Sequence, residues 1–168
     1  MTRTSGKIDG LRAAGVTPVL CDLFDEKSLT TAVKDFRPDI VVHQVTDLPD
    51  DLEKLAEFMP RNNRVRSEGT RNLLAAAQTS DTPRFLAQSI AWRSGLGTGA
   101  VVDAHEDAVI SAGGTVLRYG LFYGPGTFYE NDPPAPPRIH VDEAARRTVP
   151  FLAGPSGIFI ITDDGGTS

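Results

Sequence analysis

The chain has 168 residues, of which 40% are hydrophobic and 23% charged, and its formal net charge is -5. That length suits one domain with a core of its own, and the lack of a basic stripe argues against nucleic acid as a partner. Its one cysteine, Cys21, excludes an intramolecular disulfide. No apolar run is long enough to span a membrane, and the N-terminus lacks a signal-peptide core, so we expect a cytoplasmic protein.

Strand-like and helix-like segments alternate along the chain. In order they are a strand at 16–22, a helix at 25–36, a strand at 38–45, a short helix at 47–58, a longer helix at 62–78, a strand at 83–92, a helix at 101–112, a strand at 115–120, a helix at 141–154 and a strand at 157–164. Asp25 is a plausible N-cap. Gly69 is costly inside its helix unless another group packs close to it.

This alternation predicts βαβ units and therefore a parallel sheet. Right-handed crossovers place helices on both faces of such a sheet. The proline-rich segment 130–138 predicts a loop. We therefore expect one α/β domain over residues 1–168.

Seven phrases, in order along nearly the whole chain, resemble one protein family. They are VLCDLFDEKSLTTAV, PDIVVHQVTD, EGTRNLLAAAQ, RFLAQSIA, LRYGLFYGPG, RIHVDEAARRTV and GIFIITDD. Together they resemble the extended or atypical short-chain dehydrogenases/reductases, in the NAD-dependent epimerase/dehydratase group. The resemblance implies a Rossmann-like fold, NAD or NADP as cofactor, and a sugar nucleotide or similar carbonyl compound as substrate.

The chain departs from that family pattern and reads as truncated relative to it. The family opens with a strand and a Gly-rich turn that holds the pyrophosphate, whereas this chain resembles the pattern only from the end of the second strand, so Met1 resembles an internal methionine. The family's Tyr-x-x-x-Lys pair has no counterpart, and Arg66 stands where many members have Asn. The segment 130–168 resembles a remnant of the family's substrate-side region.

By resemblance, two residues are candidates for catalysis. Ser89, at the end of the fifth family strand, matches the serine or threonine that hydrogen-bonds the substrate carbonyl. Tyr119 opens a phrase that borders nicotinamide and substrate in the family. The alternatives are a serine that caps a strand end and a tyrosine that belongs to the core.

The same resemblance suggests a set of cofactor-binding residues. Arg3 matches an arginine that binds the 2′-phosphate of NADP, a role that suits a fixed, forked charge. An Asp-Leu pair borders the adenine in the family, and two residues after the fourth strand border the ribose. The cofactor candidates are therefore Arg3, Asp22, Leu23, Val45, Thr46 and Tyr119. The alternatives are that Arg3 is a frayed terminal residue, that Asp22 only marks the end of a strand, and that Val45 and Thr46 only pack.

Gly95, Gly97 and Ala100 spell G-x-G-x-x-A between a strand and a helix, the context of a dinucleotide fingerprint. The preceding phrase matches the fifth family strand rather than the first, however, and this favours a bridge over a phosphate site. The three histidines fit no zinc-ligand spacing, so we expect no metal.

Two functions remain open. The first is an NAD(P)-dependent epimerase/dehydratase or reductase with a small-molecule substrate. The second is a degenerate, non-catalytic relative that binds a small molecule or a partner chain. Without the family's first strands, 16–22 would pair with 38–45, stay at a new edge, or pair with another chain, so a homodimer is possible.

Overall fold

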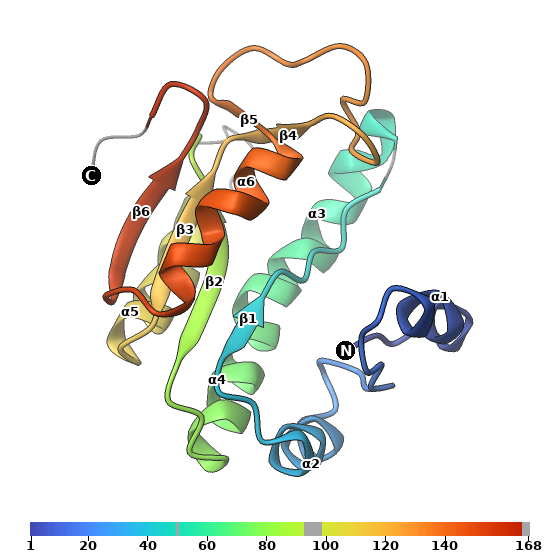
Figure 1. Cartoon of the computed structure of the whole chain (residues 1–168), viewed down its shortest axis with the longest axis vertical. Helices are drawn as coiled ribbons and strands as arrows, with labels where there is room; N and C mark the ends of the chain where they lie inside the picture. Colours follow the sequence, from blue (N-terminus) through green and yellow to red (C-terminus); the bar gives the residue numbers. More distant parts are fainter. Residues whose placement is uncertain (50, 93–98, 166–168) are drawn as a thin grey trace.

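The computed structural model describes residues 1–49, 51–92 and 99–165. Its centre is a parallel sheet of four strands in the order β1-β2-β3-β6 (Figure 1). The strands are β1 (Val41–His43), β2 (Phe85–Ile90), β3 (Thr115–Tyr119) and β6 (Gly157–Ile161). This confirms the predicted Rossmann-like α/β class.

Helices pack on both faces of the sheet, as predicted. The α-helices of the described residues are α1 (Ile8–Ala13), which lies away from the sheet, α2 (Glu26–Phe36), α3 (Leu55–Arg64), α4 (Thr70–Thr79), α5 (Gly99–Ser111) and α6 (Val141–Thr148). Short 3-10 turns lie at Ser5–Lys7, Leu52–Lys54 and Val149–Leu152. Figure 1 shows α6 on the near face of the sheet and α4 and α5 on the far face.

The core consists of two apolar layers, one on each face of the sheet. On β2, Phe85 and Ala87 belong to the layer beneath α2 and α4, whereas Leu86 belongs to the layer beneath α6. Alternate residues of a strand point to opposite faces, so both sets are buried. This is why the strands read as continuous apolar runs instead of alternating patterns.

Helix α2 begins where the sequence predicts. The Asp25 carboxylate accepts a hydrogen bond from the Ser28 main-chain N–H at 3.0 Å, which satisfies one of the unpaired donors of the first turn. Leu29 and Val33 are buried on the inner side of the helix. Arg37, with φ of 50°, ends the helix in the left-handed conformation.

The two helices predicted at 47–58 and 62–78 have wrong boundaries. In the structure α3 continues through a π-helical turn, Val65–Gly69, directly into α4. Pro60 lies inside α3, where its missing N–H removes one main-chain hydrogen bond without ending the helix. A Cβ on Gly69 would overlap the Leu23 side chain, so the close packing expected at this glycine is confirmed.

The predicted strand at 16–22 does not join the sheet. Leu20 instead forms an isolated parallel bridge with Thr2. The main chain of Thr2 is the neighbour with which this segment can form strand hydrogen bonds. Of the three arrangements considered, direct pairing with the 38–45 strand is therefore wrong. The sequence also missed a second, two-stranded parallel sheet of β4 (Leu121–Tyr123) and β5 (Arg138–His140).

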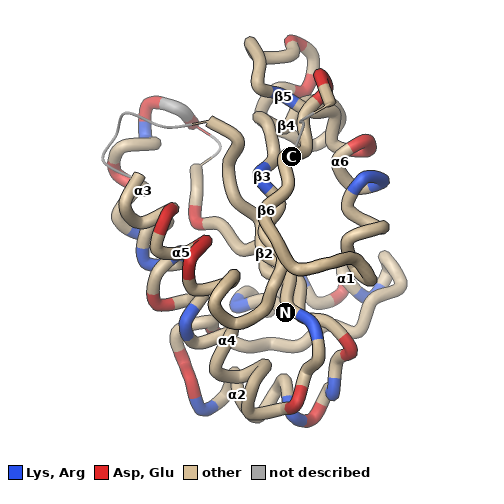
Figure 2. Tube along the Cα trace, turned by 90° about the vertical axis from the view of Figure 1, so that its left-hand side faces the viewer, with Lys and Arg blue, Asp and Glu red and all other residues tan. Residues whose placement is uncertain are grey.

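Charges are mixed over the surface of the described chain. Figure 2 shows Lys and Arg interspersed with Asp and Glu along the helices. None of the helices in the described ranges is both long and apolar enough to cross a membrane.

Gly120 joins the two sheets, and a Cβ there would lie about 2.6 Å from the Arg138 main chain. We expect Gly120→Ala to destabilise the fold by about 1–3 kcal/mol, because main chain cannot move aside as a side chain can. The matched control is Gly10→Ala in α1, where nothing lies within 4 Å and alanine favours the helix. Urea unfolding of both variants checks this, and equal stabilities would contradict it.

Candidate functional site

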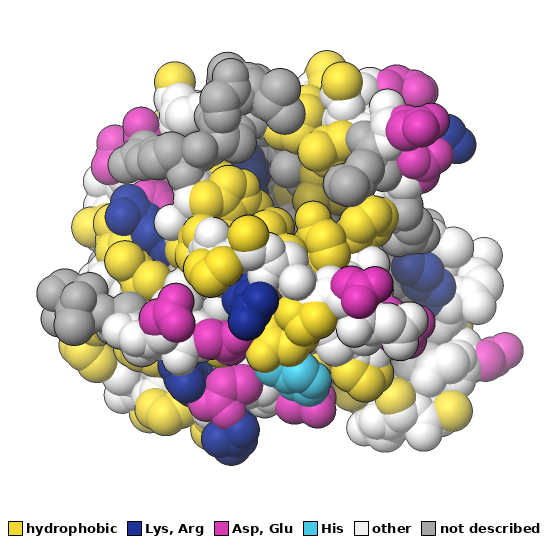
Figure 3. Space-filling model, turned by 90° about the horizontal axis from the view of Figure 1, so that it is seen from above, with side chains coloured by type: hydrophobic (Ala, Val, Ile, Leu, Met, Phe, Trp, Pro, Cys, Tyr) yellow, Lys and Arg dark blue, Asp and Glu magenta, His cyan; other side chains and the backbone are white. Residues whose placement is uncertain are grey.

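A cavity of about 740 Å³ lies between the N-terminal segment, residues 17–24 and β1. It opens near the carboxyl end of β1, where parallel sheets bind their ligands. The carboxyl ends of the strands lie at the top of Figure 1. Seen from that end, apolar side chains occupy much of the middle of the surface, with charged side chains around them (Figure 3).

Five of the predicted cofactor residues line this one cavity. They come from three separate segments and are Arg3, Asp22, Leu23, Val45 and Thr46. All except Leu23, which is half-buried, are exposed, so a ligand can reach them. Arg3 and Thr46 are 43 positions apart in the sequence (46 − 3), and the fold brings them to the same cavity.

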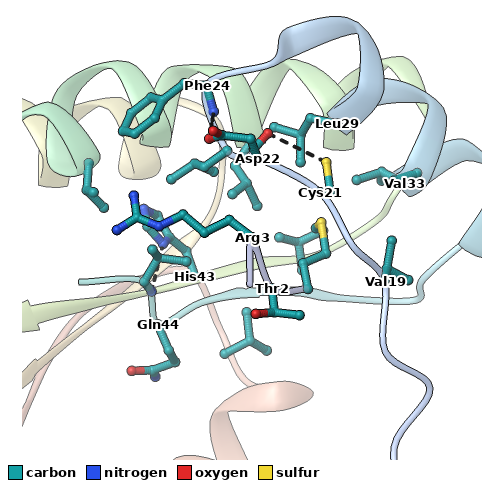
Figure 4. Close-up of a pocket in the computed structure, with 18 of the residues that line it drawn as sticks. Thr2, Arg3, Val19, Cys21, Asp22, Phe24, Leu29, Val33, His43 and Gln44 are labelled. Atoms are coloured by element: carbon teal, nitrogen blue, oxygen red, sulfur yellow. Dashed lines mark hydrogen bonds between the residues drawn. The ribbon is translucent and has the colours of Figure 1, made fainter. Parts of the chain in front are cut away.

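Asp22 lies in a tight turn at the rim of the cavity. Its Oδ1 accepts from the Phe24 main-chain N–H at 2.9 Å (Figure 4), an Asx turn that holds the carboxylate in place. Asp25 then caps α2 directly after it. The rim therefore presents a carboxylate whose second oxygen accepts no side-chain or main-chain hydrogen bond from the described residues.

Arg3 lies on the same rim and pairs with Asp47. Its Nη2 lies 3.3 Å from Asp47 Oδ2, and Arg61 Nη2 lies 3.1 Å from the same oxygen. Such pairs are worth about 1 kcal/mol or less when both partners are exposed; here the Arg3 side chain is 53% exposed and the Asp47 side chain 13%. A phosphate could therefore compete with Asp47 for this guanidinium.

Ser89 and Tyr119 do not line the cavity. Ser89 is fully buried, and its hydroxyl donates to Glu106 Oε1 at 2.5 Å. Burial raises the pKa of Glu106, but hydrogen bonds from Arg118 and Ser89 outweigh it and leave the pKa below its usual range. Glu106 is therefore a carboxylate, and the Ser89 hydroxyl donates its hydrogen bond to it.

Tyr119 is also buried, and its hydroxyl lies 2.5 Å from Thr148 Oγ1. Burial raises the pKa of Tyr119, although hydrogen bonds with Thr148 and Gln44 oppose the change. Gln44 itself lines the cavity. The Tyr119 hydroxyl is thus protonated and lies one side chain away from the predicted cofactor residues. The catalytic roles of Ser89 and Tyr119 remain predictions.

A chain of buried hydrogen bonds, which the sequence did not reveal, lies behind the cavity. It runs from His43 Nε2 to Thr70 Oγ1 (3.1 Å), then to His105 Nδ1 (2.7 Å), and from His105 Nε2 to the Gln88 carbonyl (3.0 Å). A carbonyl only accepts, so His105 carries its proton on Nε2 and accepts from Thr70 through Nδ1. Thr70 in turn accepts from His43 Nε2, which leaves His43 Nδ1 to accept from the Val45 N–H.

The fingerprint glycines Gly95 and Gly97 lie outside the described residues. Gly99 and Ala100 form the first turn of α5. No glycine is among the described residues that line the cavity.

Comparisons with known proteins agree with the sequence resemblance. Residues 2–91 match the NAD dependent epimerase/dehydratase family. The chain is 32% identical over 138 residues to a 3-diazoavenalumate denitrifying reductase of a Streptomyces species, an alignment that takes in 68% of this chain and 45% of that protein. The chain therefore spans less than half the length of this curated relative.

Solved structures of low identity share the fold. A UDP-glucose 4-epimerase of Thermotoga maritima, solved with UDP-glucose, has a TM-score of 0.73 at 17% identity and covers 98% of this chain and 68% of its own. A Thermus thermophilus UDP-glucose 4-epimerase, in complex with NAD, has a TM-score of 0.67 at 18% identity, with 92% and 72% covered.

Burial lowers the pKa of His43 to about 3, with smaller effects from His105 and Arg66. The folded state therefore favours neutral His43, and its stabilisation is complete above the unfolded pKa of 6.5 and declines as pH falls towards 3. Between pH 7.5 and 5.5 we expect His43 to remove about 1.4 kcal/mol from the free energy of unfolding. Urea unfolding of wild type and His43→Gln at both pH values measures this. An equal loss in both proteins would contradict it.

Proposed function

Because the chain belongs to the NAD dependent epimerase/dehydratase family, we propose that it binds the adenosine half of NAD or NADP in the cavity beside β1. It would do so as part of a reductase or epimerase whose substrate is a sugar nucleotide or a similar carbonyl compound. One observation carries the proposal: five residues matched to the family's adenosine contacts line a single, accessible cavity.

Each rim residue has a chemistry that suits adenosine. The second oxygen of Asp22 would accept from the adenine amino group, and Leu23 would pack on the ring. The Thr46 hydroxyl would bond the ribose. Arg3 would exchange Asp47 for a 2′-phosphate, because a guanidinium binds phosphate through two parallel hydrogen bonds.

The donor set fits only this half of the cofactor. A pyrophosphate needs main-chain N–H groups at close range, usually in a glycine-rich turn, and the described residues around the cavity include no glycine. We therefore assign the adenosine half to these residues and leave the pyrophosphate without a partner among them.

A bound nicotinamide supplies the hydride of such a reaction. On the protein side, Tyr119 keeps its proton because burial raises its pKa, so its hydroxyl would serve as a hydrogen-bond donor. Gln44 links that hydroxyl to the cavity wall. Ser89 would reach a substrate carbonyl only after its hydroxyl leaves Glu106.

A non-catalytic relative is the second candidate, and the buried hydroxyls favour it. Ser89 and Tyr119 are both buried and hydrogen-bonded within the fold. In this alternative the serine anchors Glu106 and the tyrosine anchors α6, and the cavity binds a ligand without turnover. Two assays separate the candidates, namely NADPH oxidation with a panel of aldehydes and ketones and epimerisation of UDP-glucose in the presence of NAD, since only the first candidate predicts turnover that Ser89→Ala abolishes.

If Arg3 binds the 2′-phosphate, we expect Arg3→Ala to weaken NADPH binding about tenfold and to leave NADH binding unchanged. The expected size is that of one charge-assisted hydrogen-bonded contact. Calorimetric titration of both cofactors measures it. The matched control is Arg12→Ala, which removes an arginine that is 66% exposed, against 53% for Arg3, and that pairs with Asp9.

Two results would count against the proposal. No detectable binding of either cofactor at about 1 mM to the folded chain would remove the nucleotide site altogether. Equal losses for NADPH and NADH in Arg3→Ala would remove the phosphate contact and keep the site.

A further inference from the structure

Asp47 is the point at which two arginines from distant segments converge. Arg3 Nη2 lies 3.3 Å from Asp47 Oδ2, while Arg61 Nη2 and Nε lie 3.1 and 3.2 Å from the same atom. One carboxylate oxygen has about two acceptor sites, and charge-assisted hydrogen bonds are usually about 2.7–2.9 Å long. Three nitrogens at these longer distances therefore compete for one oxygen, and the two guanidiniums are only partly satisfied.

The charges at this point do not balance. Within the described residues Arg3 and Arg61 form ion pairs with Asp47 alone, so two positive charges share one negative charge. The Arg61 guanidinium also lies over the Phe58 ring, 4.6 Å from its centroid. A phosphate monoester carries a charge of about −1.5 to −2 at pH 7 and has three acceptor oxygens. It would neutralise both arginines and satisfy more of their N–H groups than one carboxylate oxygen does.

The fold holds this point in place from two sides. The Asp47 main-chain N–H donates to Asn62 Oδ1 at 3.1 Å, and Asn62 is buried in α3 next to Arg61. On the other side, the main chain beside Arg3 is hydrogen-bonded to residues 19 and 21. The Asp47 side chain can therefore turn away while its main chain, and the segments that carry both arginines, stay where they are.

We propose that Asp47 holds the place of a ligand phosphate, which Arg3 and Arg61 bind together once the Asp47 side chain has turned away. The inference rests on the adenosine site proposed above, because Arg3 and Asp47 line that cavity, and it identifies the phosphate as the 2′-phosphate of NADP. Arg61 is then a second specificity-determining residue beside Arg3, and Asp47 is an internal competitor of the phosphate.

This competition sets the preference between the two cofactors. NAD has a 2′-hydroxyl in place of the phosphate, so it leaves the contacts of Asp47 intact and gains nothing from their loss. NADP must displace the Asp47 carboxylate before its phosphate reaches both guanidiniums. Removal of the Asp47 charge should therefore strengthen the binding of 2′-phosphorylated ligands alone.

A purely structural role for Asp47 gives a different result. In that case the carboxylate only ties the N-terminal segment to α3 through Arg3 and Arg61. Its loss would then loosen the N-terminal segment, and every ligand of the cavity would bind equally well or less well. A selective gain in affinity for a 2′-phosphate separates the two roles.

Calorimetric titration with adenosine 2′-monophosphate, adenosine and inorganic phosphate tests the proposal, at about pH 8, where phosphate is a dianion. Asp47→Asn removes the charge at nearly constant volume. We expect it to bind adenosine 2′-monophosphate about fivefold more tightly than wild type, the factor that corresponds to one exposed ion pair, and to bind adenosine as wild type does. The matched control is Asp9→Asn, which removes the carboxylate paired with Arg12 outside the cavity lining and should change neither affinity.

A second variant tests the role of Arg61. In the Asp47→Asn background, Arg61→Ala should abolish the gain for adenosine 2′-monophosphate and leave adenosine binding unchanged, whereas Arg12→Ala in the same background should keep the gain. Circular dichroism checks the fold of each variant. Asp47→Ser also lacks the charge and gives the same comparison if Asp47→Asn does not fold.

The outcomes separate this inference from the adenosine site. If adenosine binds, but Asp47→Asn gives no gain or an equal gain for both nucleosides, the competition is wrong and the adenosine site stays. If adenosine does not bind at about 1 mM, the adenosine site is wrong. Tighter binding of inorganic phosphate to Asp47→Asn would then keep the two-arginine site and overturn its assignment to NADP, and no phosphate binding would overturn both.

Discussion

A parallel strand carries main-chain hydrogen-bonding groups along both edges, and β2 satisfies only one edge of β1. An unsatisfied buried N–H or C=O costs about 1–3 kcal/mol, and the other edge of β1 avoids that cost because Val42 is 40% exposed. The cavity borders this edge of β1, and the buried core residues Leu29, Val33 and Leu73 line it. The rim residues then gather where the cavity opens.

A second constraint acts behind the sheet, where polar groups are buried and must find partners. Glu106 is held by Arg118 and Ser89, and the two buried histidines are joined through Thr70. These hydrogen bonds occupy Ser89, His43 and His105, the side chains that look most reactive in the sequence. A serine or histidine near the end of a strand can therefore either contact a ligand or hydrogen-bond a buried polar group. Its burial decides which of the two it does.

The order and type of most elements could be predicted from local patterns. Asp25 predicts the start of α2, and the apolar runs of β2 and β3 predict strands that are buried on both faces. Gly69 signalled a close contact whose partner, Leu23, lies far away in sequence. The continuous helix from α3 to α4 could not be predicted, because Pro60 suggests a break that the packing of the π-helical turn overrides. The short strands β4 and β5 have too few residues to leave a pattern.

Alternating apolar periods and capping residues by themselves determined that this chain forms a parallel α/β sheet, because both depend on neighbours within a few positions. The family resemblance, and not these local patterns, marked Arg3, Asp22 and Thr46 as candidates. Only the tertiary structure decided that these residues share one cavity, that Ser89 is locked to Glu106, and that residues 19–21 pair with Thr2 instead of β1. Pairing and burial join groups that are distant along the chain, and no local pattern records which distant edge is within reach.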